Sequence, residues 1–418
     1  MQETNRIYHF FLWLVWPIMT LYLGIKYIRT PLALPLLSLF SLFFGLTFVI
    51  NYQTDADSVR YAQEFISLNE RNLSIGDIGD YLFRSEESKV DLYQPLITWF
   101  LSNFTDNPKI LFAVFGLIFG IFHIKNTLLV IHQTPEKAGF IITLLLLTFV
   151  LINPIWSING VRMWTAAQIF IYGLLTSYLV GNKSRGLIWC IASVFVHFSF
   201  LFPVLLILLY RVIPKNMAVL FGFFIVSFSI SQLNLDIMRQ YVELLPALFQ
   251  EKVMMYTKEA VVEKFLEEGE SPVPLGWHVI LANNLLRYFV AASLVFLYVR
   301  YVMYKDIFTE NLRVFLALGL FFSAFANISA LIPSGSRFLV IGDSIAMVAI
   351  IIYVAQYPFD DLLNYMLKII SPALAFVVIF KIRIGFDFIG FSTVFGNPLL
   401  ALFFQDNEPI IEFIKSIL

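Results

Sequence analysis

Long apolar stretches recur along this chain from near its start almost to its end. A transmembrane helix needs about 20 consecutive apolar residues, and a chain with many such stretches folds as helices packed in lipid. Of the 418 residues, 59% are hydrophobic and 14% are charged. We therefore predict an all-α integral membrane protein, a single polytopic domain over residues 1–418, with about eleven (10–12) transmembrane helices. The predicted spans are 9–28, 32–50, 110–131, 138–153, 160–181, 186–210, 216–232, 278–299, 314–332, 338–357 and 362–380.

Charge, cysteine content and missing motifs argue against several classes of function. The 28 basic and 29 acidic residues give a net charge of −1, so nothing points to nucleic acid as a partner. The one cysteine, Cys190, allows neither a disulfide nor a thiolate metal site within the chain. The absence of P-loop, H-E-x-x-H and G-x-S-x-G motifs argues against ATP-driven work, zinc hydrolysis and serine hydrolase chemistry. The first apolar stretch shows no cleavage pattern, and we expect it to be retained as a helix.

The loops differ in charge, which predicts the side of the membrane on which each lies. Loops rich in Lys and Arg are expected in the cytoplasm, whereas the acidic loop 52–107 is expected outside. Within it, apolar residues recur at helical spacing over 91–104 and predict a helix at the membrane interface. A second external loop, 233–277, is expected to be either a lid over a lipid substrate or a plain solvated loop. The apolar tail 385–418 is expected to pack against the bundle or to enter the bilayer.

The charged loops do not all alternate between the two sides of the membrane if each of the eleven stretches crosses it once. If every stretch crosses once, the cluster Arg300, Lys305 and Arg313 falls outside, against the positive-inside tendency. One repair makes 186–211 a broken or re-entrant pair, interrupted near His197, which is tolerated where the backbone lines a protein cavity. An error in the helix count elsewhere would repair the alternation equally well.

Three ionisable residues, Arg162, His197 and Arg337, lie within or at the end of apolar stretches. Such groups cost roughly 2.5–3.5 kcal/mol each on insertion, so they usually face a protected cavity. Arg162 follows an Asn-Gly turn and Arg337 a Pro-Ser-Gly turn, so each could hold an anion near a helix N-terminus. Snorkelling to the interface is the alternative for Arg162. His197 could serve as a general base, or as a core histidine bonded to a carbonyl.

Further candidate residues surround these three. Asp55 and Asp57 form an Asp-x-Asp pair of the kind that binds a divalent ion in many sugar transferases. A catalytic or sugar-binding carboxylate, a solvated turn, or pairing of Asp57 with Arg60 are the alternatives. Arg287 lies in the middle of an apolar stretch, where it could contact a phosphate or pair with an acid such as Asp343. The polar residues expected to contact substrate are Asn51, Tyr52 and Asn159.

Four motifs occur in order along the chain: TDADSVRYAQEF, NGVRMWTAAQIFIYGLL, SVFVHFSFLFPVLL and SRFLV. In this order they resemble the EpsG-type branch of the Wzy-like polysaccharide polymerases, over roughly residues 50–400. The arginine followed by His-Phe-Ser is the most specific part. The resemblance implies the architecture of multi-spanning transferases that use polyprenyl-linked sugar donors, which is GT-C-like or Wzy-like.

The implied activity is a metal-independent glycosyl transfer that needs no cofactor. Oligosaccharide repeats would be moved from undecaprenyl diphosphate onto another lipid-linked repeat, on the external or periplasmic face of the bacterial inner membrane. Arg162 and Arg337 would hold the diphosphate, and His197 would orient or deprotonate the acceptor hydroxyl. Asp55 or Asp57 would be the rival base. The implied partners are the lipid-linked donor and acceptor, the bilayer and a chain-length regulator.

Two other classes of function fit the same residues. A transporter or flippase of lipid-linked sugars would use the buried cations for binding, and inverted repeats would favour it. A ligase or a histidine-based acyltransferase of the same compartment is the other alternative. The sequence leaves open the sugars, the linkage and whether the product is capsule, exopolysaccharide or O-antigen.

Overall fold

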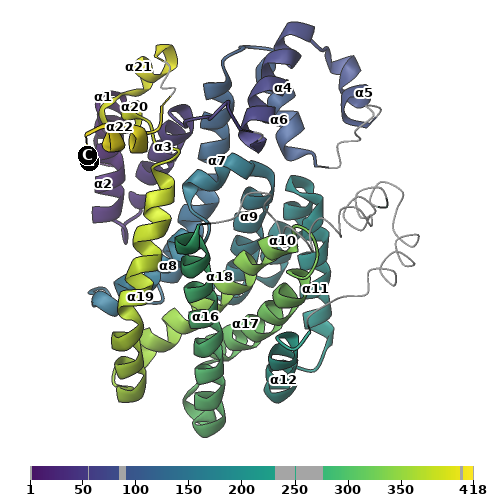
Figure 1. Cartoon of the computed structure of the whole chain (residues 1–418), viewed down its shortest axis with the longest axis vertical. Helices are drawn as coiled ribbons and strands as arrows, with labels where there is room; N and C mark the ends of the chain where they lie inside the picture. Colours follow the sequence, from purple (N-terminus) through teal and green to yellow (C-terminus); the bar gives the residue numbers. More distant parts are fainter. Residues whose placement is uncertain are drawn as a thin grey trace. The chain divides into compact units, whose positions relative to one another are not determined.

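The computed structural model describes residues 2–54, 56–83, 91–230, 250, 276–404 and 408–417, and their regular structure is helical apart from two isolated bridges (Figure 1). Asp55 and nearly all of the predicted loop 233–277 lie outside these residues. The chain divides into two compact units. Unit 1 comprises Met1–His132, Asn153–Leu201 and Lys381–Leu418, and unit 2 comprises Gln133–Ile152 and Phe202–Phe380.

Six helical segments among the described residues are long and apolar enough to cross a membrane. They are Pro108–Ile131, Phe140–Tyr178, Trp277–Met303, Glu310–Ser329, Gly335–Gln356 and Asp361–Gly385, and the shorter apolar helices are Ala33–Leu46, Phe198–Val212 and Met217–Ser227. This confirms a multi-span helical membrane protein, whereas the count of eleven spans is not confirmed. One reason is that breaks shorten some apolar stretches. The stretch 9–28, for example, is divided at Pro17 between α1 (Gln2–Val15) and α2 (Ile18–Lys26), because proline interrupts helical hydrogen bonding.

In unit 1, a cluster of aromatic residues joins the long helices to the segment between them. The long α7 (Pro108–Ile131) packs against α3 (Ala33–Leu46) and α9 (Val161–Tyr178). The intervening segment forms α4 (Asp57–Arg71), α5 (Ile78–Phe83) and α6 (Tyr93–Ser102). One buried cluster contains Tyr61 of α4, Phe115 of α7 and Val161 at the start of α9. The start of α9 is therefore held against α4, and this contact builds the site described below.

The chain breaks at His197, where one of the two interpretations of the charge pattern placed an interruption. Helix α10 (Lys183–Val196) ends there because His197 is extended, with φ −149° and ψ 119°. A short turn, η3 (Phe198–Phe200), then leads into α11 (Leu201–Val212), whose third residue, Pro203, is tolerated in the first turn of a helix. The broken pair is thus confirmed, and its re-entrant course through the membrane stays a prediction.

Helices α9 and α10 approach closely through two glycines. A Cβ atom added to Gly173 would lie 2.6 Å from the carbonyl oxygen of Gly186, and one added to Gly186 would lie 2.4 Å from that of Gly173. Small residues that let backbones touch are a common device for packing helices in lipid. This contact fixes α9 and α10, which carry Arg162 and lead to His197.

We expect Gly173→Ala to lower the unfolding free energy by about 1–3 kcal/mol, because the added methyl forces the two helices apart. Gly222→Ala on α12 (Met217–Ser227) is the matched control, since its Cβ meets nothing within 4 Å. There the gain in helix propensity leaves stability equal or higher. Thermal unfolding of the purified protein in detergent checks both variants. Equal melting temperatures for Gly173→Ala and Gly222→Ala would contradict the close approach of α9 and α10 at Gly173.

The predicted helix within 91–104 is confirmed as α6, and its position at the membrane interface stays a prediction. The tail forms the short helices α20 (Phe391–Phe395), α21 (Pro398–Phe403) and α22 (Ile410–Ile417). Thr393 Oγ1 donates to Thr47 Oγ1 at 2.9 Å, and Lys109 Nζ donates to the carbonyl of Ala401 at 2.7 Å. The tail is therefore packed against α3 and α7 within unit 1.

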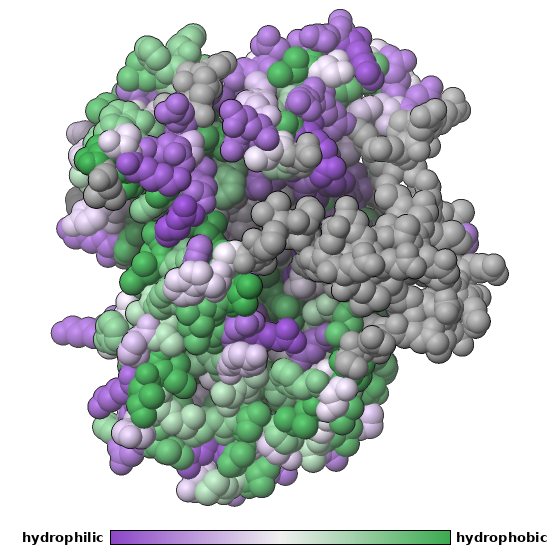
Figure 2. Space-filling view, viewed as in Figure 1, coloured by the Kyte–Doolittle hydropathy of each residue, from purple (hydrophilic) through white to green (hydrophobic). Residues whose placement is uncertain are grey.

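Among the long described helices of unit 2, α17 (Glu310–Ser329) and α18 (Leu339–Gln356) are central, whereas α16 (Trp277–Met303) and α19 (Asp361–Gly385) are outer. Burial inside the protein reaches 78% for the span of α17 and 72% for the span that contains α18. It is only 28% for both α16 and α19. Figure 2 shows a largely hydrophobic surface over α16 and α19, whereas hydrophilic residues gather over α4 and α5 of unit 1. The contrast fits outer helices that face lipid and an α4–α5 segment that faces water.

A buried ion pair fixes one end of unit 2. Arg300, in the last turn of α16, donates from Nη2 to Asp360 Oδ1 at 2.6 Å. Asp360 also accepts from the Tyr353 hydroxyl at 2.7 Å and from the Leu363 backbone at 3.1 Å. Burial opposes ionisation of this carboxyl, but the three hydrogen bonds and the charge of Arg300 hold its pKa below the ordinary value. This cluster joins α16 to the α18–α19 connection.

Candidate functional site

Arg162 lies in the first turn of α9, where two side chains orient its guanidinium. Nε donates to the Tyr61 hydroxyl at 3.1 Å, and Nη1 donates to Asp91 Oδ2 at 3.1 Å. The guanidinium carbon also lies 5.7 Å from the centre of the Tyr61 ring, close enough for a cation–π contact. Among the described residues, Nη2 has no hydrogen-bond partner, and 37% of the side chain is exposed. Part of this fork is therefore free to bind a ligand.

His197 is bonded to the same carboxylate. Its Nδ1 lies 3.0 Å from Asp91 Oδ2, and the backbone N–H of Phe198 donates to Asp91 Oδ1 at 2.7 Å. The extended backbone at His197 makes this possible, because it ends α10 and turns the Phe198 N–H away from the helix. Nε2 of His197 has no hydrogen-bond partner in the part of the chain that the structure describes. The imidazole therefore has one fixed nitrogen and one available nitrogen.

Asp91 joins the arginine to the histidine. Its side chain is 4% exposed. Burial opposes ionisation of this carboxyl, but the hydrogen bond from His197, the charge of Arg162 and the Phe198 N–H hold its pKa below the ordinary value. An ionised carboxylate can only accept hydrogen bonds, so the proton between Asp91 and His197 belongs to Nδ1. In the neutral imidazole, Nε2 then carries the lone pair that a general base needs.

Tyr61 closes the other side of Arg162. Burial raises the pKa of Tyr61 to about 12, although the charge of Arg162 acts in the opposite direction. The phenol is therefore protonated at neutral pH: its oxygen accepts from Arg162 Nε, and its O–H is still able to donate. Because α4 carries Tyr61 and the loop before α6 carries Asp91, the predicted external segment supplies both residues that orient the arginine.

Asp57 and Asn159 lie beside this cluster. Ser58 donates to Asn159 Oδ1 at 2.6 Å, which joins the start of α4 to the 3₁₀ turn before α9. A Cβ atom on Gly160 would lie 3.6 Å from Asp57 Oδ2. Asp57 is paired with Arg60, which is the structural alternative considered for it from the sequence. Its role as a base or sugar contact stays a prediction.

The other predicted residues of the first loop are less closely associated with the cluster. Asn51 accepts from the backbone of Gln53 at 3.0 Å within an exposed turn, and Tyr52 beside it is 55% exposed. Their contact with substrate stays a prediction. Asp55 lies outside the described residues, so the Asp-x-Asp pair is described only through Asp57. Among the described residues, no group of three His, Cys, Asp or Glu side chains is placed to hold a metal ion.

The remaining predicted cations belong to unit 2. Arg337 lies in the turn η5 (Gly335–Phe338) before α18, is exposed and forms no ion pair with a described residue. Arg287 of α16 donates from Nη2 to Asn327 Oδ1 at 3.3 Å. Arg287 does not form an ion pair with Asp343 or with any other described carboxylate, so the expected structural pair is not observed. The part that either arginine plays in binding a diphosphate stays a prediction.

Two residues of the cluster, Asp91 and Tyr61, were missed from the sequence. Asp91 lies in the acidic loop 52–107 and Tyr61 lies in the TDADSVRYAQEF motif, but neither residue was singled out as a candidate for the site. A usable signal was present, because a buried cation favours a nearby anion and Asp91 is the first residue of the helix predicted over 91–104. Nothing in local periodicity distinguishes Tyr61.

Comparison with known proteins gives one result. The sequence profile of the EpsG family matches residues 32–393, which is most of the chain and includes every residue of the Arg162–Asp91–His197 cluster. No curated protein matches the chain, and no solved structure matches it. Because the match extends over far more than half of the sequence, the chain belongs to the EpsG family.

Proposed function

We propose that this protein is a polysaccharide polymerase that transfers an oligosaccharide repeat from undecaprenyl diphosphate to a second lipid-linked repeat. The reaction takes place on the external face of the cytoplasmic membrane. The observation that carries the proposal is the single buried carboxylate, Asp91, that is shared by Arg162 and His197. Family membership supports a polysaccharide polymerase, and the cluster supports a way of performing the transfer.

Arg162 is proposed to bind the diphosphate leaving group. Two of its nitrogens are used within the protein, and Nη2 is available for charge-assisted hydrogen bonds to phosphoryl oxygens. The polyprenyl chain can stay in lipid while the diphosphate reaches Arg162.

His197 is proposed to accept the proton of the acceptor hydroxyl. Nδ1–H is held by Asp91, so Nε2 is the basic nitrogen. The acceptor oxygen attacks the anomeric carbon, the bond from that carbon to the diphosphate oxygen breaks, and the hydroxyl proton moves to Nε2. Asp91 does not contact substrate in this scheme and acts as a positioning residue. Asp57 is the rival base, although it is paired with Arg60.

The charge balance of the cluster favours the transition state over the ground state. With Asp91 ionised and His197 neutral, the charges of Asp91 and Arg162 cancel. When His197 accepts a proton, the cluster gains one positive charge as the leaving diphosphate gains negative charge. Interactions that strengthen only in the transition state raise the rate of the chemical step. Partial neutralisation of Arg162 by Asp91 is therefore compatible with catalysis.

Reconstitution of the purified protein with lipid-linked repeats tests the proposal. Glycans longer than one repeat, still attached to lipid diphosphate, support a polymerase. Movement of the substrate across vesicles without new glycosidic bonds would identify a transporter instead. Transfer of glycan to a different acceptor would identify a ligase. An acyl product whose formation survives Arg162→Gln would identify an acyltransferase, because acyl transfer needs the histidine alone.

A further inference from the structure

A wide cavity opens at the end of unit 2 where α16 ends and α18 leads into α19. Its volume is about 460 Å³, which lies in the range of small-molecule sites. Three segments line it: the end of α16 with the short turn η4 (Lys305–Ile307), the last turn of α18, and residues 357–362. Thr309 Oγ1 donates to Gln356 Oε1 at 3.1 Å, and the Tyr357 hydroxyl donates to the carbonyl of Ile307. These two hydrogen bonds hold the walls of the cavity in place.

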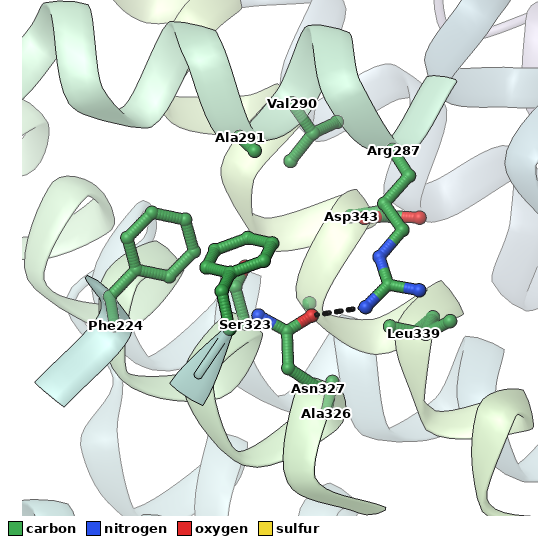
Figure 3. A pocket seen from close by; sticks show the side chains of 11 residues that line it. Phe224, Arg287, Val290, Ala291, Ser323, Ala326, Asn327, Leu339 and Asp343 are labelled. Atoms are coloured by element: carbon green, nitrogen blue, oxygen red, sulfur yellow. Dashed lines mark hydrogen bonds between the residues drawn. The ribbon is translucent and has the colours of Figure 1, made fainter. Parts of the chain in front are cut away.

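Size separates this cavity from a smaller one beside Arg287, which Figure 3 shows from close by. The smaller cavity, between α12, α16, α17 and α18, has a volume of about 10 Å³, which is room for one water molecule. There the guanidinium of Arg287 is bonded to the amide of Asn327 (Figure 3). An organic ligand therefore fits only the wider of these two cavities.

Aromatic rings form much of the wall of the wide cavity. The centroids of the Tyr353 and Tyr357 rings lie 4.8 Å apart, and Tyr304 and Phe359 also line the cavity. Phe359 is 92% exposed, and its ring contacts no other ring among the described residues. The face of an aromatic ring attracts cations, and the guanidinium carbon of Arg300 already lies 5.6 Å from the centre of the Tyr304 ring. The ring of Phe359 is left for a ligand.

The lining of the wide cavity carries one net negative charge. Arg300 is neutralised by Asp360, whose carboxylate oxygens also accept from Leu363 and Tyr353. Asp361 is exposed, and its side chain forms no hydrogen bond or ion pair with a described residue. The flanking charges, two basic and two acidic, balance in number and are Lys305, Asp306, Glu310 and Arg313. The lining therefore attracts a cation, whereas an anion would be repelled by the unpaired carboxylate of Asp361.

We propose that the wide cavity binds an organic ammonium group, which lies against the ring of Phe359 and pairs with the carboxylate of Asp361. These free groups offer a cation–π contact and an ion pair, and an alkylammonium takes part in both. The same chemistry occurs in a zwitterionic lipid head group and in a free amine. Leu362, Tyr365 and Ile369 recur at helical spacing on α19 as exposed apolar side chains, so a lipid head group is able to reach the cavity from the bilayer. The inference depends on unit 2 alone and stands whether or not the protein polymerises sugars.

Binding of choline to the purified full-length protein in detergent tests the site. The comparison probe is the neutral isostere of choline, in which a carbon atom replaces the nitrogen, so the shape is kept and the charge is lost. We expect choline to bind at least about fivefold more tightly than the isostere, because only the cation pairs with Asp361 and with the face of Phe359.

The source of the ammonium group is tested with two lipids of equal short chain length, phosphatidylcholine and phosphatidylglycerol. Both carry a phosphate, and only the first carries an ammonium group. Binding of choline itself identifies a site that accepts a free amine. Preference for phosphatidylcholine over phosphatidylglycerol, without binding of choline, identifies a site for a lipid head group.

Two substitutions test the residues that the proposal names. Asp361→Asn removes the ion pair, Phe359→Leu removes the ring and keeps apolar area, and each is expected to weaken binding by about two- to fivefold. Both side chains are exposed and have no described hydrogen-bond or ring partner, so the melting temperature is expected to stay close to that of wild type. Asp106→Asn is the matched control, since it removes an exposed carboxylate without a described partner from unit 1 and leaves binding unchanged. Absent binding, equal binding within both pairs of probes, or wild-type binding in both Asp361→Asn and Phe359→Leu would overturn the proposal.

Discussion

Replacement of Arg162 by lysine is expected to abolish polymer in cells while the amount of protein stays normal. Lysine keeps the positive charge, but it cannot bind Tyr61, Asp91 and a phosphoryl group at once, because its ammonium is a single point and not a planar fork. Loss of one preorganised donor to a developing oxyanion costs about 10²–10³-fold in rate. The measurement is the length distribution of polymer from cells and from purified protein.

Arg300→Lys is the matched control for this substitution. Arg300 is also held by a buried carboxylate, Asp360, but it lies at the end of unit 2 described above and has no role in the proposed transfer. A loss of polymer in Arg162→Lys with near-normal polymer in Arg300→Lys supports a direct role. Polymer of wild-type length and amount in Arg162→Lys would contradict the proposal that Arg162 binds the diphosphate leaving group.

Asp91→Asn is expected to cause a loss of about 10³-fold in the rate of bond formation, although Asp91 touches no substrate in the proposed reaction. An asparagine amide would present N–H groups to His197, so Nδ1 would become the acceptor and Nε2 would carry the proton. The imidazole would then be in the wrong tautomer to act as a base. The measurement is a single-turnover rate with purified protein, and the matched control is Asp360→Asn, which removes another buried carboxylate bonded to an arginine.

The same substitution is expected to lower stability in a way that depends on pH. Because the pKa of Asp91 is held below its ordinary value of 3.8, its stabilising contacts are fully present above that value and are lost as pH falls through the lowered pKa. Arg162 is more than a third exposed, so most of the effect comes from the hydrogen bonds of His197 and Phe198. The melting difference between wild type and Asp91→Asn is thus largest near neutral pH. A constant difference down to pH 3 would contradict the lowered pKa of Asp91.

The sequence predicted those residues of the candidate site that differ in polarity from their neighbours in the chain. A charge within an apolar stretch stands out, so Arg162 and His197 were identified as candidates. The charge of the flanking loops left two interpretations open, and the structure has the break at His197 that one of them placed there. The family resemblance was correct for the same reason, because these residues form the most specific motif. Hydropathy alone was enough to predict that the chain is a multi-span helical membrane protein.

What the sequence did not predict depends on contacts between distant residues. Asp91 reaches Arg162 across 71 positions and His197 across 106, and no local pattern indicates such a pairing. Tyr61 likewise meets Arg162 across 101 positions. The count of eleven spans stays a prediction, since hydropathy measures the length of an apolar stretch and not the breaks within it, such as the one at Pro17.

The most direct test of the account is the single-turnover rate of glycosidic bond formation by purified His197→Gln with a defined lipid-linked donor and acceptor. Glutamine can still bind Asp91 but cannot accept a proton, so the account predicts a fall of about 10²–10⁴-fold with donor binding retained. A rate within twofold of wild type would contradict the proposal that Asp91, Arg162 and His197 form the centre that joins the repeats.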